Sequence, residues 1–215
     1  MDMSADTSTD MSAVRIDGLS LPNACRITPV RHADRRGFFY EAFRSDAVTE
    51  AIGYPFRVRQ FHCSVSRRGT IRGIHGTLLP PGQEKLVTCV RGEIMDVAVD
   101  LRLGSPTFGR YEMLHQVAGN GVSLYLADGF GHAFLALTDD ACVTFLCSEE
   151  YRHGTMLHVN ALDPDIAIPW DLTGAPVMSD KDAAAPTLAQ AADRGLLPSY
   201  EECLAHYEAR RHQAA

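Results

Sequence analysis

The sequence predicts an all-β protein, an antiparallel jelly roll or β-sandwich barrel followed by short C-terminal helices. Two observations support this fold class. From residue 14 to residue 160, most runs alternate polar and apolar residues or are solidly β-branched and aromatic. Gly, Pro, Asn or Asp ends these runs about every ten residues, a spacing typical of antiparallel sandwiches and barrels.

The predicted strands follow one another with short turns between them. Examples of these runs are residues 37–43, 56–65, 85–90, 93–102, 121–127, 132–138 and 142–148. Turn sequences such as "PPGQ" and "LGSP" separate neighbouring strands. Only "SDAVTEAI", residues 45–52, has helical character within this region.

The chain divides into three predicted segments of one domain, because 215 residues suffice to bury one substantial core. Residues 1–13 are polar and acidic and lack the features of a secretory signal, so we expect a disordered leader. Residues 14–175 form the jelly roll. Residues 176–215 are Ala-rich, with Ser or Asp before each helical stretch as an N-cap, and predict a helical extension packed on the same domain.

Composition and charge limit the partners of the protein. The formal net charge of −7 opposes broad attraction to nucleic acid or to anionic membranes, although a local anion site remains possible. The six Cys residues form no CxxC pair, which argues against a disulfide framework and a zinc knuckle and favours reduced thiols in the cytoplasm. No apolar stretch approaches the roughly 18 residues of a membrane-spanning helix.

Several common functional motifs are absent. The sequence contains no GxGxxG before a helix, no GxxxxGK[ST], no GxSxG and no HExxH. It also lacks the His-x-His and nearby Glu that are usual in metal-binding jelly rolls. We therefore predict no metal and no cofactor, with convergence of His62, His75 and His132 on a metal as the open alternative.

His75 in "TIRGIHGTLLPPGQEKLV", residues 70–87, is the first candidate for a catalytic residue. A lone His in a β-rich chain is most simply a core residue that hydrogen-bonds to the backbone. However, Arg72, Gln83 and Lys85 lie close in sequence, and such polar groups must reach water to avoid burial without partners. A barrel mouth or lumen is the predicted location.

Two further residues, His132 and Asp163, are candidates for the same site. His132 lies among core-like aromatic residues and is equally compatible with a structural role, and Asp163 begins an Asp-Pro dipeptide that by itself predicts only a turn. Together, a His, an orienting Asp, a Lys and an Arg are the groups needed for abstraction of a proton beside a carbonyl.

Longer segments add a family resemblance. "DRRGFFYEAF", "RQFHCSVSRRGTIRGIHGTLLPPGQEKLVTCVRGEIMDVAVDLRLGSPTFG", "DGFGHAFLAL", "EEY", "LDPDIAIPW" and "SDKD" resemble, in order and spacing over residues 24–182, the dTDP-4-dehydrorhamnose 3,5-epimerases, or RmlC-like cupins. The resemblance implies a cupin-type antiparallel jelly roll. It also implies a cofactor-independent epimerase of a dTDP-4-keto-6-deoxyhexose that works through an enolate, in deoxysugar biosynthesis, and a homodimer.

The resemblance assigns roles to individual residues. The base of the family falls on His75, its partner Asp on Asp163, its active-site Lys on Lys85 and a further catalytic His on His132. The nucleotide-sugar contacts fall on the remaining matched positions, which are Arg36, Phe38, Glu41, Gln60, Arg72 and Tyr151. Arg grips phosphates bidentately and aromatic rings stack on bases, so these residue types suit a nucleotide.

The sequence departs from the family pattern at three places. Phe145 stands where the family has its catalytic Tyr, His62 stands where Asn is common, and Gly76-Thr77 replaces Tyr-Gln. The second proton carrier is then another group such as His62, Tyr151 or water. Three outcomes follow: a mono-epimerase, a 3,5-epimerase with a relocated acid, or another reaction on a nucleotide sugar. A non-catalytic or metal-binding cupin that binds a sugar ligand is the alternative from another class.

Overall fold

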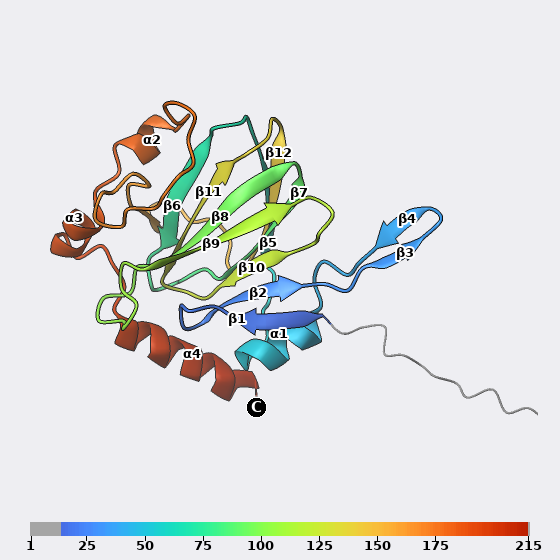
Figure 1. The fold of residues 1–215 in the computed structure, drawn as a ribbon. Helices are drawn as coiled ribbons and strands as arrows, with labels where there is room; N and C mark the ends of the chain where they lie inside the picture. The colour runs from blue at the N-terminus through green and yellow to red at the C-terminus, as the bar shows by residue number, and fades with distance from the viewer. Residues whose placement is uncertain (1–13, 215) are drawn as a thin grey trace, which may run out of the picture.

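The computed structural model describes residues 14–214, and two antiparallel sheets packed face to face form its centre (Figure 1). The six-stranded sheet has the order β1 (Arg15–Gly18), β2 (Ala24–Thr28), β10 (Ser123–Leu126), β7 (Lys85–Arg91), β12 (Ala141–Cys147), β5 (Gln60–Ser66). The five-stranded sheet has the order β13 (Met156–His158), β6 (Ile71–Thr77), β11 (Phe130–Ala136), β8 (Glu93–Asp100), β9 (Tyr111–Val117). The predicted all-β fold class is confirmed.

Side-chain alternation places the core between the two sheets. In β12, Ala141, Val143, Phe145 and Cys147 are buried while the residues between them are partly exposed. This period of two is the one expected for a strand with one face on the core. In contrast, every residue of β11 is buried because this strand is central in its sheet and covered on both faces.

The helices lie outside the sandwich. The segment 45–52 forms α1 (Ser45–Ile52), as its sequence predicts. The C-terminal region forms α2 (Asp180–Ala183), α3 (Leu188–Asp193) and α4 (Tyr200–Ala214). Ser179 caps α2 by accepting the Asp182 N–H, and Thr187 caps α3 within a capping box. Helix α4 contributes Cys203 and Tyr207 to the main apolar cluster.

Two strand predictions need correction. The run 37–43 is not a strand of the sandwich: only β4 (Gly37–Phe39) forms, and it pairs with β3 (His32–Asp34) in a separate hairpin that projects from the body (Figure 1). The run 56–65 begins its strand only at Gln60. The example runs do not include β1, β2, β6, β9 or β13.

The predicted leader, residues 1–13, lies outside the described residues. Within residues 14–214, no helix has the length and apolar character required to cross a membrane.

Candidate functional site

A cavity of about 330 Å³ lies between the two sheets. Strands β5, β7 and β12 supply one wall and strands β6 and β11 supply the other. The lining residues are Gln60, His62, Ser64, Arg72, His75, Gln83, Lys85, His132, Phe134, Phe145, Tyr151 and Met156. The fold therefore gathers most of the side chains that the sequence predicts for the site, apart from Arg36, Phe38, Glu41 and Asp163.

Strand register places three histidines side by side on the five-stranded sheet. His75 of β6 pairs with His132 of β11 on one side and with His158 of β13 on the other. Directly paired residues in antiparallel strands project from the same face, so the three imidazoles form a row. Gly73 permits the close approach of β6 to β11, since a Cβ there would lie 2.5 Å from the Ala133 Cβ.

His75 is paired with Asp182, a residue of α2. The His75 Nε2 lies 2.7 Å from the Asp182 Oδ1. Burial acts to raise the pKa of Asp182, but hydrogen bonds from His75 and Ser179 outweigh it and hold the pKa below its usual value. An ionised carboxylate on Nε2 orients the ring and stabilises its protonated form, which is the arrangement of a general base.

The predicted pairing of His75 with Asp163 is wrong. The Asp163 side chain is buried outside the cavity, where its Oδ1 accepts the Asp165 N–H at 2.9 Å and its Oδ2 accepts the Leu188 N–H at 2.5 Å. Asp163 thus anchors the start of α3, as expected of a carboxylate at a helix N-terminus. The carboxylate that contacts His75 is Asp182, which lies 19 positions after Asp163 in "SDKD". The sequence interpretation gave this segment no role.

His132 belongs to a second His–Asp pair. Its Nε2 lies 2.6 Å from the Oδ1 of Asp96, and the Oδ2 of Asp96 accepts a hydrogen bond from the Gln116 side chain at 2.8 Å. Burial raises the pKa of Asp96, and the charge and hydrogen bond of His132 oppose that rise. The Nδ1 is the ring nitrogen left for the cavity side.

Phe145 lies between His62 and His132. The His62 ring stacks on Phe145 with centroids 4.7 Å apart and planes at 16°, while His132 meets the same ring edge-on at 5.5 Å. Burial, followed by the charges of Lys85 and His132, lowers the pKa of His62. A titratable imidazole thus lies on the phenyl ring at the position where the resemblance expects a tyrosine hydroxyl.

Lys85 is the buried cation of the cavity. Its side chain comes from the start of β7, and burial lowers its pKa while the charges of Cys147 and Asp128 oppose that shift. An ammonium group in such a pocket can stabilise a developing oxyanion strongly, because little water competes with it.

The rim of the cavity is fixed by Arg72 and Gln60. The Arg72 guanidinium donates to the Ser66 hydroxyl at 3.0 Å and to the Val65 carbonyl at 3.3 Å, which ties β6 to β5. Gln60 accepts the Tyr151 backbone N–H at 2.7 Å and so holds the segment after β12. The Tyr151 side chain remains 58% exposed at the mouth of the cavity.

Three predicted nucleotide contacts lie away from this cavity. Arg36 and Phe38 belong to the projecting hairpin, where Arg36 pairs with Asp34 at 2.6 Å and Phe38 is 46% exposed. Glu41 follows the hairpin and lies 3.5 Å from Arg44. Within the described chain, the structure does not bring these three side chains to His75.

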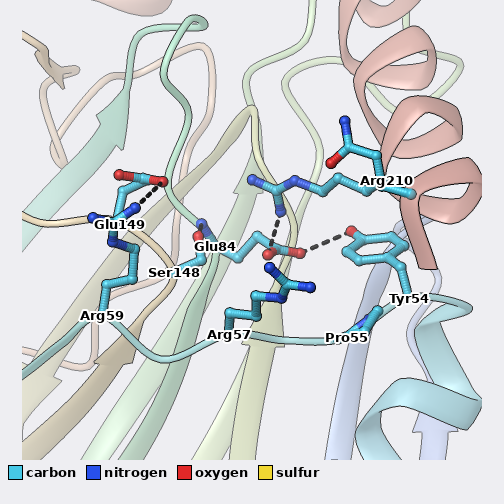
Figure 2. A pocket seen from close by; sticks show the side chains of 9 residues that line it. Tyr54, Pro55, Arg57, Arg59, Glu84, Ser148, Glu149 and Arg210 are labelled. Atoms are coloured by element: carbon cyan, nitrogen blue, oxygen red, sulfur yellow. Dashed lines mark hydrogen bonds and ion pairs between the residues drawn. The ribbon is translucent and has the colours of Figure 1, made fainter.

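A second, polar cavity of about 220 Å³ lies between α4 and the loop residues that adjoin the start of β7 and the end of β12 (Figure 2). Arg210 of α4 forms ion pairs there with the buried Glu84 and, at 3.3 Å, with the buried Asp128. Glu84 also accepts the Tyr54 hydroxyl at 2.8 Å. Burial raises the pKa of Asp128 to about 7, and Arg210 opposes this rise. Glu84 lines the polar cavity, and the next residue, Lys85, lines the cavity of His75.

One group within residues 14–214 has the spacing of metal ligands. One donor atom each from His75, His158 and Asp182 lie within 4.8 Å of one another. The alternative trio of His62, His75 and His132 is not found as such a group among the described residues.

Comparison with known proteins identifies the family of this fold and site. The sequence profile described as dTDP-4-dehydrorhamnose 3,5-epimerase matches residues 18–190. The chain belongs to the dTDP-4-dehydrorhamnose 3,5-epimerase family. Its enzyme class is therefore that of the sugar epimerases, which are isomerases, and the cupin-type jelly roll is confirmed by solved members of this epimerase family.

Individual relatives cover nearly the whole chain. A dTDP-4-dehydro-6-deoxyglucose 3-epimerase of Streptomyces bikiniensis is 47% identical over 193 residues, which is 90% of this chain and 98% of that protein. A dTDP-4-dehydrorhamnose 3,5-epimerase of Mycolicibacterium smegmatis is 45% identical over 90% of this chain and 95% of that protein. The structure of ChmJ, a 3'-monoepimerase from Streptomyces bikiniensis in complex with dTDP-quinovose, aligns with a TM-score of 0.87 at 47% identity, covering 90% and 98% of the two chains.

Sequence reasoning on this epimerase missed Asp96, Asp182 and His158. A signal for Asp96 was present: in "EIMDVAVD" it occupies an inward position of a strand, where a carboxylate needs a partner. Asp182 and His158 had no comparable local signal. A Cβ at Gly76 would meet Phe130, Leu157 and Leu101, none of which lines the cavity, so the Gly76 position faces away from it.

Proposed function

We propose that this chain epimerises a dTDP-4-keto-6-deoxyhexose at C3, by proton abstraction and reprotonation through an enolate, without a cofactor. The observation that carries the proposal is the His75–Asp182 pair on one wall of a cavity whose other wall holds Lys85 and His62. The carbonyl at C4 acidifies the C3 proton, which a neutral imidazole can remove. Lys85 would stabilise the enolate oxygen.

His62 is the proposed proton donor. An epimerase must remove a proton from one face of the sugar and return one to the other, so its base and acid face each other. His75 belongs to the five-stranded sheet and His62 to the six-stranded sheet, so a sugar bound between the sheets would have one on each side. The lowered pKa of His62 makes its imidazolium a stronger acid than a free one.

A relative supports the assignments of His75 and Phe145. One structure of ChmJ, the 3'-monoepimerase, is a double mutant with dTDP bound, in which a His is changed to Asn and a Tyr to Phe. The two changed positions are separated by as many residues as His75 and Phe145. This spacing supports the role of His75 as the base, and it supports Phe145 as the natural replacement of a tyrosine.

The active unit in this proposal is a cytoplasmic homodimer. The hairpin β3–β4 projects from the body (Figure 1) and leaves Phe38 and Phe39 46% and 66% exposed. Such a hairpin is suited to reach a second copy of the chain, where Arg36 and Phe38 would grip the nucleotide beside the partner's cavity. The six free cysteines suit a reducing compartment.

Proton NMR in D₂O with dTDP-4-keto-6-deoxyglucose tests the proposal. We expect deuterium at C3 together with inversion of that centre, and no label at C5. Label at both centres would show a 3,5-epimerase. No label with any nucleotide 4-keto sugar would contradict the epimerase function and favour a sugar-binding cupin without catalysis.

A further inference from the structure

We propose that His75, His158 and Asp182 form a binding site for a zinc-type divalent cation, and that a cation bound there inactivates His75 as a base. The three residues come from β6, β13 and the start of α2, which meet at one edge of the five-stranded sheet. One donor atom of each lies within 4.8 Å of the others. Imidazole nitrogens and a carboxylate oxygen are the ligands of many zinc sites.

The three donor atoms are close enough to reach the spacing of a tetrahedral ion through side-chain shifts. The Asp182 Oδ1 lies 2.7 Å from the His75 Nε2 and 3.5 Å from the His158 Nδ1. Ligands at about 2.0–2.2 Å from zinc in tetrahedral geometry lie roughly 3.3 Å apart. Small shifts of the Asp182 side chain would therefore admit the ion, and three protein ligands leave a fourth position for water.

His158 is the residue that distinguishes this group from an ordinary His–Asp pair. Both of its ring nitrogens are buried, and neither has a hydrogen-bond partner among the described residues. The ring meets His75 edge-on with centroids 4.9 Å apart. A buried imidazole without partners is costly, and a metal ion would satisfy one of its nitrogens.

The effect on catalysis follows from the tautomer of His75 and rests on the proposed function. The Nε2 faces Asp182, so the Nδ1 is the nitrogen that remains for the substrate. A neutral imidazole that binds a cation through Nε2 carries its single proton on Nδ1. No lone pair is then left to accept the C3 proton.

Lys181 provides an electrostatic test. Its positive charge acts on His158 from α2 and opposes a bound cation. A Lys181→Gln variant removes that charge without touching the three ligands, so it should bind zinc more tightly than the native chain. His115 provides the matched control, because it is an exposed histidine that pairs with one carboxylate, Glu93, at 3.2 Å.

Isothermal titration of Zn²⁺ into the chelator-treated full chain, without substrate, tests the site. We expect one ion per chain, at least tenfold weaker binding in His158→Gln and unchanged binding in His115→Gln. X-ray absorption should show two imidazole ligands, and circular dichroism should show that the variants fold. Equal affinity of the native chain and His158→Gln, with no gain in Lys181→Gln, would overturn the site.

Epimerase assays with added zinc test the inactivation separately. The native enzyme should lose activity as the site fills and recover it with chelator. In His158→Gln, measured against the zinc-free activity of that same variant, at least tenfold more zinc should be needed for the same fractional loss. Full activity with the site occupied would overturn the inactivation, whereas absence of epimerase activity in all chains would contradict the proposed function and leave the titration to decide the site.

Discussion

The His75 Nε2 lies 2.7 Å from the Asp182 Oδ1, although 107 residues separate them in the chain. Changing Asp182 to Asn should lower kcat on the order of 10²- to 10⁴-fold with little change in KM, because the ring loses the charge that stabilises its protonated form. Stopped-assay kinetics measure this. Asp163→Asn is the control: it should lower the melting temperature by weakening the start of α3 and leave kcat nearly unchanged. The opposite pattern would restore Asp163 as the catalytic partner.

The stacking of His62 on Phe145 predicts that exchange and inversion are separable. In His62→Gln, His75 can still remove the C3 proton and return deuterium to the same face, so label should enter while epimerisation falls about 10²-fold or more. Proton NMR in D₂O measures both. Adding Phe145→Tyr to this variant should recover inversion by supplying a hydroxyl donor. Loss of exchange and inversion together would show that His62 is not the separate acid.

The lowered pKa of His62 predicts an unusual pH profile. Donation requires the imidazolium, whose population falls as pH rises through a pKa below the ordinary 6.5. The alkaline limb of kcat/KM should therefore lie in the acidic to neutral range in the native enzyme. In the double variant His62→Gln/Phe145→Tyr the limb should move toward the ordinary tyrosine pKa of about 10. An alkaline limb at the same pH in both enzymes would exclude His62 as its source.

The exposed rings of the hairpin predict that each subunit contributes hairpin residues to the nucleotide site of its partner. Changing Phe38 and Phe39 together to Ser should weaken the dimer, because the apolar contact with the partner is lost. Light scattering measures the mass in solution, and calorimetric titration with dTDP should show a weaker affinity. Val58→Ser, an exposed apolar position of comparable accessibility outside the hairpin, is the control. A stable dimer with native dTDP affinity in the hairpin variant would contradict this role.

The buried Asp128 predicts loss of stability with rising pH. Its folded pKa of about 7 exceeds its ordinary value of 3.8, so between these values the folded chain holds a proton that the unfolded chain has released. The free energy of unfolding falls through this range. Asp128→Asn is neutral at every pH and should flatten the profile. From pH 5 to pH 8, the free energy of unfolding of the native chain should fall by about 1 kcal/mol or more relative to that of the variant. Urea unfolding at both pH values measures it, and parallel profiles would refute the assignment.

Local sequence was sufficient for the fold class and for most of the cavity wall. The alternation in "ACVTFLC" places Phe145 inward, and β12 shows that alternation. His62, His75, Lys85 and His132 line one cavity because strands with regular turns return inward-facing positions to a shared centre. Such patterns are carried by consecutive residues, so they can be read without knowing which strands pair.

Only the tertiary structure decided that Asp182 is the carboxylate that orients His75 and that His158 is the histidine whose ring contacts it. Asp163 and Asp182 both follow the last strand of the sandwich, and sequence spacing does not distinguish them. The path of the chain after β13 distinguishes them: it places Asp163 at the start of α3, where it accepts the Leu188 N–H, and it places Asp182 beside His75 of β6. His158 meets His75 through the register of β13 with β6. Strand register and chain reversal depend on packing between distant segments, and no local pattern of residues encodes them.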